Sequence, residues 1–191
     1  MMTASMLSGC GSQAEEKSEV AQETKKEDSD LSNTLVYAGE SEDTINPILN
    51  NHDELPSIIF SGLMKYDEKG APIEDLAESY EYDEATMTYT FHLRDGVKWH
   101  DGKEFTAKDV VFTYDLLTKD ESLTASITSN YEDIKEVTAE DDLTVKIVMA
   151  DYNAAMLDNF TIGILPEHLL KGEDINTTSF NQKPVGTGRY K

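Results

Sequence analysis

Cysteine is nearly absent from this sequence, because Cys10 is the single one among 191 residues. One thiol cannot form a disulfide within the chain, and it cannot supply the several cysteines of a structural zinc site. Folds held together by disulfides or by cysteine-bound zinc are therefore excluded.

Basic residues are also scarce, with 16 Lys and Arg against 38 Asp and Glu, which gives a formal net charge of −22. Affinity for nucleic acids and for anionic lipid headgroups comes from Lys and Arg side chains, so we expect no nucleic-acid partner. Such a charge favours solubility and can attract cationic ligands. The plainer interpretation is an acidic surface without a specific ligand.

The usual arrangements of catalytic and metal-binding residues are missing. No Gly-x-Ser-x-Gly elbow occurs, and no two histidines have the i, i+4 spacing of a helical metal site. Carboxylate pairs arise by chance at this density of acids and do not predict a glycosidase. Gly186-Thr187-Gly188 lacks the third glycine and the following helix of a phosphate loop. We therefore expect no enzyme, no metal site and no cofactor. The histidines are His52, His92, His100 and His168.

Long apolar runs are missing as well, and no segment approaches the ~20 apolar residues of a membrane span. Residues 11–32 consist mainly of Ser, Gln, Glu, Lys and Asp. Such a composition cannot bury enough apolar surface to order itself, so these residues are predicted to be a disordered acidic tether.

A strand, a turn and a capped helix are predicted in succession between residues 89 and 117. Tyr89, Phe91 and Leu93 alternate with polar residues, which indicates a strand with one apolar face. Asp101-Gly102 is a hairpin signal for a type I′ turn between short strands. Thr106 followed by Asp109 indicates a capping box that opens a helix. The single tryptophan, Trp99, is interpreted as a core residue rather than a ligand-stacking one.

The remaining patterns predict a mixed α/β (α+β) fold. Alternating apolar residues predict strands at 134–137 and 143–149, and Pro166 in a first turn predicts a helix after it. A short buried strand is expected at 34–38, a short helix at 154–160 and a polar loop at 119–130. A helix capped by Asp53 is expected to carry a core face. That face would consist of Leu55, Ile58, Ile59 and Leu63.

The string FHLRDGVKWHDGKEFTAKDVVFT at residues 91–113 resembles the signature segment of bacterial extracellular solute-binding proteins, family 5. These proteins serve peptide, dipeptide and nickel ABC importers. Further segments resemble the same family: SEDTINP at 41–47, FSGLM at 60–64 and PVGTGRY at 184–190, the last of which leads into a strand in that family. Arg189 departs from that pattern, because it stands where the family has proline.

The resemblance implies a partial periplasmic-binding-protein type II lobe plus a β-rich subdomain. It assigns residues 33–48 to the first strand and loop of lobe I, 49–163 to the β-rich subdomain, and 164–191 to a truncated return into lobe I. Proteins of this family are two-lobed and much longer. The second lobe, and most of the residues that determine the ligand, are therefore expected to lie outside this sequence.

The resemblance also implies which residues face the ligand. In the family, the loop after the first strand and the residues after its Asn-Pro pair border the cleft. The alternative is that these residues form a solvated loop that contacts no ligand. The corresponding positions here are Glu42, Asp43, Asn50, Asn51, His52 and Asp53.

Leu7-Ser8-Gly9-Cys10 resembles a bacterial lipobox, in which the cysteine is lipidated. A secretory signal needs a basic n-region and an apolar stretch of about 7–15 residues. Residues 1–6 provide neither, so residues 1–10 are interpreted as a truncated signal and lipobox whose upstream part is not in the sequence. We expect an extracytoplasmic protein that is lipid-anchored to the outer face of the cell membrane, or periplasmic.

The function implied by the resemblance is that of the substrate-binding component of an ABC importer. It would capture extracellular oligopeptides, nickel or other small solutes between two lobes and deliver them to membrane permease subunits. We expect a monomer. The alternative is a cell-surface structural or interaction module without a small-molecule site.

Overall fold

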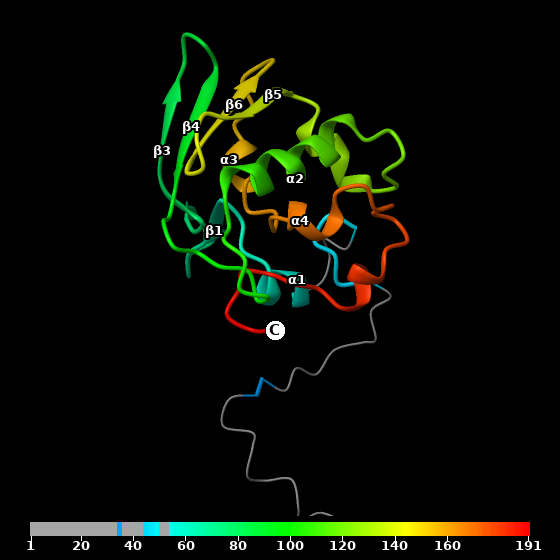
Figure 1. Ribbon diagram of the computed structural model, residues 1–191. Coiled ribbons are helices and arrows are strands. Elements are labelled where there is room, and N and C mark those ends of the chain that lie inside the picture. The colour runs from blue at the N-terminus through cyan, green and yellow to red at the C-terminus, as the bar shows by residue number, and fades with distance from the viewer. Residues whose placement is uncertain (1–33, 36–43, 50–53) are drawn as a thin grey trace, which may run out of the picture. The chain divides into compact units, whose positions relative to one another are not determined.

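The computed structural model describes residues 34–35, 44–49 and 54–191 (Figure 1). Three sequence-based expectations lie outside these residues: the lipobox with Cys10, the tether at 11–32, and most of the strand at 34–38. Thr34 and Leu35 are exposed and belong to no strand. Within the described ranges, no helix is long and apolar enough to cross a membrane.

The elements of the described chain follow one another as short helices and antiparallel strands. In order they are α1 (Leu55–Ile59), β1 (Met64–Tyr66), β2 (Pro72–Glu74), β3 (Ala77–Asp83), β4 (Thr88–Leu93), α2 (Ala107–Lys119), the 3-10 helix η2 (Ser126–Tyr131), β5 (Ile134–Ala139), β6 (Thr144–Met149), α3 (Met156–Asn159), α4 (Glu167–Leu170) and the 3-10 helix η3 (Ser179–Gln182).

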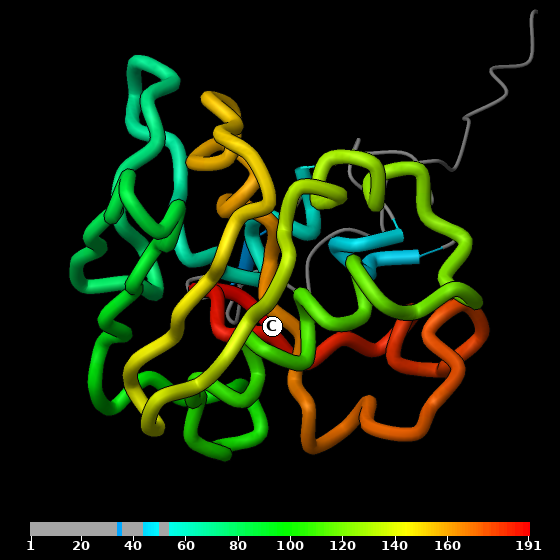
Figure 2. Tube along the Cα trace, turned by 90° about the horizontal axis from the view of Figure 1, so that it is seen from above, coloured from blue at the N-terminus to red at the C-terminus, as the bar shows by residue number. Residues whose placement is uncertain are grey.

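A four-stranded antiparallel sheet with the order β3-β4-β6-β5 forms the framework (Figures 1 and 2). β4 is a central strand, and its Tyr89, Phe91 and Leu93 are buried, as the alternation predicts. Phe91 pairs with Val145 of β6, which is also buried. β1 and β2 form a separate antiparallel hairpin, and the Gly70 N–H donates to the Asp67 carbonyl in the turn between them.

The helix α2 begins where the capping box predicts. The Asp109 carboxylate accepts a hydrogen bond from the Thr106 N–H at 2.9 Å. α2 packs on β5 and β6 and buries Val110, Tyr114 and Leu117. Its amphipathic face therefore covers the apolar face of the sheet.

Aromatic rings occupy the centre of the core. Phe160 packs edge-on against Tyr89, Phe91 and Tyr114, with ring centroids 5.2, 4.9 and 5.9 Å away. Phe160 lies just after α3, so the short helix predicted at 154–160 is confirmed and delivers a ring to the middle of the sheet. Such edge-on pairs are favoured by the ring quadrupoles.

Trp99 is a core residue, as predicted, with 2% of its surface exposed. Its indole Nε1–H donates to Asp109 Oδ2 at 3.4 Å, and Asp109 Oδ1 accepts from the Glu167 N–H at 2.9 Å. Burial raises the pKa of Asp109, against the lowering effect of the hydrogen bonds that it accepts. One buried carboxylate thus joins the turn before α2 to the start of α4.

Four sequence-based details are wrong. The turn at Asp101-Gly102 is not type I′, because only Gly102 has a positive φ, of 88°, and one isolated bridge replaces the expected strand pair. The helix after residue 53 ends at Ile59, since Phe60 is extended, and its N-cap is Glu54. Part of the loop at 119–130 forms η2. Residues 184–191 contain no strand.

Residues 44–49 and the last 3-10 helix, η3, lie side by side in both views (Figures 1 and 2). Asn46 Nδ2 donates to Asn181 Oδ1 at 3.0 Å, and the Ile45 N–H donates to the Asn181 carbonyl at 2.8 Å. Both asparagines are buried. This contact fixes the position of Pro47, which follows Asn46 in the chain.

Candidate functional site

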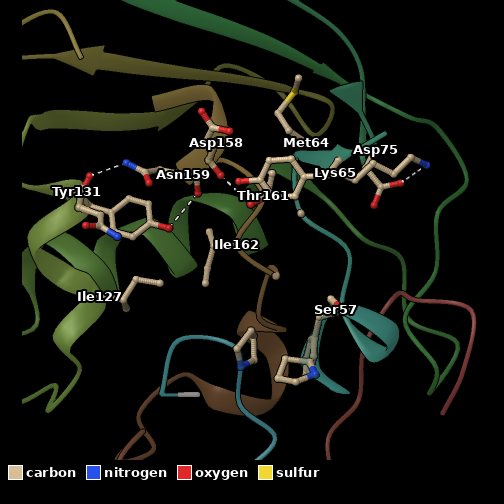
Figure 3. Close-up of a pocket in the computed structure, with 17 residues that line it drawn as sticks. Ser57, Met64, Lys65, Asp75, Ile127, Tyr131, Asp158, Asn159, Thr161 and Ile162 are labelled. Carbon is tan, nitrogen blue, oxygen red and sulfur yellow. Dashed lines mark hydrogen bonds and ion pairs between the residues drawn. The ribbon is translucent and has the colours of Figure 1, made fainter. Parts of the chain in front are cut away.

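A cavity of about 400 Å³ lies between α1 and η2, and we call it the α1–η2 pocket (Figure 3). Its volume is within the range of small-molecule sites, which are mostly apolar with a few polar groups. Five parts of the chain line it: the loop before α1, α1 itself, β1 with Asp75, η2, and the segment around α3. The lining residues are Pro47, Pro56, Ser57, Phe60, Gly62, Met64, Lys65, Tyr66, Asp75, Ile127, Asn130, Tyr131, Asp158, Asn159, Thr161, Ile162 and Gly163.

One wall of the α1–η2 pocket is formed by two prolines that flank residues 50–53. Pro47 follows the buried Asn46, and Pro56 lies in the first turn of α1, where a missing N–H costs nothing. Gly163 packs against this wall: a Cβ there would lie 2.6 Å from Phe60 Cβ and 3.1 Å from Pro47 Cβ. Position 163 therefore requires glycine, because a larger residue would collide with this wall.

The opposite wall is held by hydrogen bonds between η2 and the α3 segment (Figure 3). Tyr131 Oη donates to the Asn159 carbonyl at 2.9 Å, and Asn159 Nδ2 donates to the Asn130 carbonyl at 3.0 Å. Thr161 Oγ1 donates to the Asp158 carbonyl at 2.6 Å. Burial raises the pKa of the Tyr131 hydroxyl far above its ordinary value, so it remains a neutral donor. This wall is preformed.

Three polar side chains of the α1–η2 pocket are available to a ligand. Within the part of the chain that the structure describes, the Asp158 carboxylate, the Asn130 amide group and the Tyr66 hydroxyl have no hydrogen-bond partner. At the edge of the pocket, Lys65 Nζ lies 3.0 Å from Asp75 Oδ1. The pocket therefore offers apolar surface, an acceptor for an amine at Asp158, and both charges of an ion pair.

Metal binding finds no support in the described ranges, where no group of three or more His, Cys, Asp or Glu side chains could hold an ion. His92 is exposed on β4. His100 is half-buried and bonded to the backbone of Gly186 and Gly188. His168 Nε2 lies 2.7 Å from Asp101 Oδ2.

All six residues predicted to face the ligand lie outside the described residues. Asn50, Asn51, His52 and Asp53 belong to the segment between the pocket-lining Pro47 and Pro56; Glu42 and Asp43 precede that segment.

The pocket residues Asn130, Tyr131 and Asp158 are not predicted from the sequence. The sequence predicts a polar loop at 119–130 and a short helix at 154–160, with no binding role for either. The two segments are joined by the hydrogen bonds of Tyr131 and Asn159. No local pattern signals this meeting, although a tyrosine beside a polar loop was the one available hint.

Comparison with known proteins identifies what the chain is similar to. A family model described as bacterial extracellular solute-binding proteins, family 5 Middle, matches residues 71–191. The oligopeptide-binding protein AppA of Bacillus subtilis is 37% identical over 171 residues, which cover 82% of this chain and 31% of AppA. The chain thus spans about a third of the length of this curated relative, and 26% of the length of others.

Solved structures give the same result at the level of the fold. NikZ from Campylobacter jejuni, in complex with Ni(L-His), has a TM-score of 0.75 and 41% identity, and the match covers 80% of this chain and 31% of NikZ. AppA from Bacillus subtilis, in complex with a nonapeptide, has a TM-score of 0.72 and 31% identity, over 77% of this chain and 31% of AppA.

Proposed function

This chain belongs to family 5 of the bacterial extracellular solute-binding proteins, and from this membership we propose that it is part of the substrate-binding component of an ABC importer. Members of the family bind substrates for transport and are not enzymes. The fold is mixed α/β, a partial type II periplasmic-binding-protein lobe with a β-rich subdomain. The whole protein would capture an extracellular solute and pass it to membrane permease subunits.

The α1–η2 pocket is the observation that carries the proposed ligand site. It combines a preformed wall, apolar surface and the unpaired Asp158 carboxylate. Asp158 suits the terminal amine or a basic side chain of a peptide, since a charge-assisted hydrogen bond is about twice as strong as a neutral one. We propose that the ligand lies against this wall and that residues 42–43 and 50–53 border it.

An oligopeptide or another amine-bearing solute is the ligand class that the pocket favours over free nickel. The relatives bind different ligands: AppA is named for oligopeptides, and NikZ was solved with Ni(L-His). The described residues hold no cluster of metal-ligating side chains. A chelated metal would present its organic part to the pocket, as a peptide would present its own polar groups.

Family membership implies an extracytoplasmic location. We propose in addition that Cys10 carries a lipid anchor, that residues 11–32 tether the folded part, and that the protein acts as a monomer. We propose the division into lobe I at 33–48, a β-rich subdomain at 49–163 and a return into lobe I at 164–191.

Calorimetry on the full 191-residue chain tests the ligand class. Mixed oligopeptides should bind weakly, at about millimolar affinity or weaker, because a single wall leaves the ligand half solvated. Asp158→Asn should weaken this binding several-fold, while Asp95→Asn should not, because Asp95 is an exposed carboxylate with no partner among the described residues. Micromolar binding of Ni²⁺ alone, unaffected by Asp158→Asn, would contradict the proposal.

A further inference from the structure

His100 is bonded through both ring nitrogens to a segment 86 residues later in the chain. Nδ1 accepts a hydrogen bond from the Gly186 N–H at 3.2 Å, and Nε2 lies 2.7 Å from the Gly188 carbonyl oxygen. The His100 backbone N–H also donates to the Gly186 carbonyl at 2.9 Å. One residue thus makes three hydrogen bonds to Gly186 and Gly188.

These partners fix the protonation state of the ring. A peptide N–H can only donate, so the Nδ1 that faces Gly186 carries a lone pair and no proton. A carbonyl oxygen can only accept, so the Nε2 that faces Gly188 carries the proton. The ring is therefore the neutral Nε2–H tautomer, set by its contacts.

The segment that His100 holds lies directly on the end of α1. The Gly188 N–H donates to the Ile59 carbonyl at 2.8 Å, and Thr187 Oγ1 accepts from the Ser61 N–H at 3.4 Å. A Cβ on Gly188 would lie 2.5 Å from the Ile58 carbonyl oxygen, and one on Gly186 would collide with the Ile59 carbonyl. These glycines therefore serve a close backbone approach.

α1 is also a wall of the α1–η2 pocket, to which it contributes Pro56 and Ser57. The helix has only five residues, so it cannot hold its position by its own hydrogen bonds. The Gly186–Gly188 segment satisfies the Ile59 carbonyl at its carboxyl end, and His100 fixes that segment from the other side.

We propose that His100 is a proton-sensitive positioning residue, which in its neutral form clamps Gly186–Gly188 onto α1 and thereby fixes the α1 wall of the pocket. The clamp is a property of the described chain, and its effect on a ligand rests on the proposed function. Protonation adds a proton at Nδ1, which then faces the Gly186 N–H as a second donor. That hydrogen bond is lost, while the bond from Nε2–H to Gly188 remains.

The charged groups on the elements around His100 do not substitute for this clamp. No ion pair joins the His100 ring to a charged side chain in the described ranges. Asp101, the nearest carboxylate in sequence, is bonded to His168 of α4. The other charged groups on these elements are Lys98, Lys103 and Glu104 on the same turn, Glu54 beside α1, and Lys183, Arg189 and Lys191 on or next to the clamped segment.

Nuclear magnetic resonance of the full 191-residue chain tests the clamp without a ligand. Long-range proton–nitrogen correlation at neutral pH should show an unprotonated Nδ1 and a protonated Nε2 at His100. As the imidazole protonates at lower pH, the hydrogen-exchange protection factor of the Gly186 amide should fall by about five- to tenfold, the equivalent of one hydrogen bond. A protonated Nδ1 at neutral pH, or a pH-independent protection factor, would overturn the proposal.

Three variants assign the effect to His100. His100→Asn keeps an oxygen acceptor near the Nδ1 position and cannot titrate, so protection of Gly186 should become independent of pH. His92→Asn, at the exposed histidine of β4, and His168→Gln, at the partner of Asp101, should keep the wild-type pH response. An unchanged response in His100→Asn would overturn the proposal, and so would its loss in His168→Gln.

Peptide binding is measured separately from the protection of the Gly186 amide. If the clamp is present, peptide binding should weaken at low pH in the wild-type chain and not in His100→Asn. If no peptide binds at any pH, the proposed function fails while the clamp stands on the amide data. If peptide binds with the same pH dependence in both proteins, the link from the clamp to the pocket fails.

Discussion

Asn46 and Asn181 are both buried and are joined through their side-chain amides, with Nδ2 of Asn46 3.0 Å from Oδ1 of Asn181. Asn46 Oδ1 also accepts from the Ile48 N–H, and Asn181 Nδ2 donates to the Ile175 carbonyl. The pair connects positions 135 residues apart and places Pro47 at the wall of the α1–η2 pocket.

Replacement of either asparagine should destabilise the fold. Asn46→Ala or Asn181→Ala leaves a buried partner group unsatisfied, which costs about 1–3 kcal/mol of unfolding free energy. The double variant should lose less than the sum of the two. Urea unfolding measures this, with Gln182→Ala, at an exposed residue of the same 3-10 helix, as the control expected within about 0.5 kcal/mol of wild type. Additive losses would show that the pair is not coupled.

The two faces of β4 should differ sharply in their contribution to stability. Phe91 is fully buried and packs on Phe160, so Phe91→Ala should cost about 3–5 kcal/mol. Thr90 is only partly buried on the other face, and Thr90→Ala should cost well under that. Denaturant midpoints of the two variants provide the measurement, and similar midpoints would contradict the register.

The contact between Asp101 and His168 should make stability depend on pH. Burial alone would raise the pKa of Asp101, but hydrogen bonds from His168 and the Lys103 N–H outweigh it and hold this pKa below its usual range. As the pH falls, the Asp101 carboxylate therefore takes up a proton in the unfolded chain before it does so in the folded chain. The folded state loses stability as the pH falls from about 4 through the folded-state pKa of Asp101.

Asp101→Asn should remove this part of the acid sensitivity. Because both side chains are partly exposed, the difference is expected to be no more than about 1 kcal/mol. Unfolding free energies of the wild-type and variant chains between neutral and acidic pH are the measurement, with His168→Gln expected to remove only part of the effect because the Lys103 N–H bond to Asp101 remains. Parallel curves for wild type and both variants would remove the basis of this prediction.

The proposed anchor at Cys10 makes a prediction about location. If the chain is secreted behind a lipoprotein signal, Cys10 should carry a diacylglyceryl group and retain the protein on membranes, since two acyl chains hold far more firmly than one. Cys10→Ser should release it to the soluble fraction. Cell fractionation decides this, and equal membrane retention of the two forms would contradict the anchor.

Three strands of the sheet, β4, β5 and β6, could be predicted because each carries its own apolar pattern, whereas β3 was not predicted. The alternation of β4 and β6 and the Thr106–Asp109 capping box are local, and the structure has them at the predicted residues. The prediction of a helix from residue 55 to Leu63 is wrong beyond α1, because the extended backbone of Phe60 ends the helix. The spacing of the apolar residues gives no sign of this end. The prediction of a type I′ turn is wrong because that turn needs a positive φ at two successive residues. Here only Gly102 has a positive φ, and Asp101 has a negative one.

The α1–η2 pocket could not be predicted, because its walls come from segments about a hundred residues apart. Pro47 and Pro56 carry no binding signal, and Tyr131 and Asn159 belong to short elements without a strong period. The glycines of Gly186-Thr187-Gly188 are easily noticed in the sequence. Glycine is needed there because the Ile58 and Ile59 carbonyls lie too close for a Cβ, and only the folded chain brings those carbonyls near.

Chemical-shift mapping tests the central claim, that the α1–η2 pocket is the ligand-binding wall of this family member. The isotope-labelled chain is titrated with mixed oligopeptides. We predict that the backbone amides of Asn130, Asp158 and Ile162 shift together with a midpoint of about millimolar or weaker, and that Asp158→Asn moves this midpoint to higher concentration. Peptide-induced shifts that leave these three amides unchanged would contradict the account.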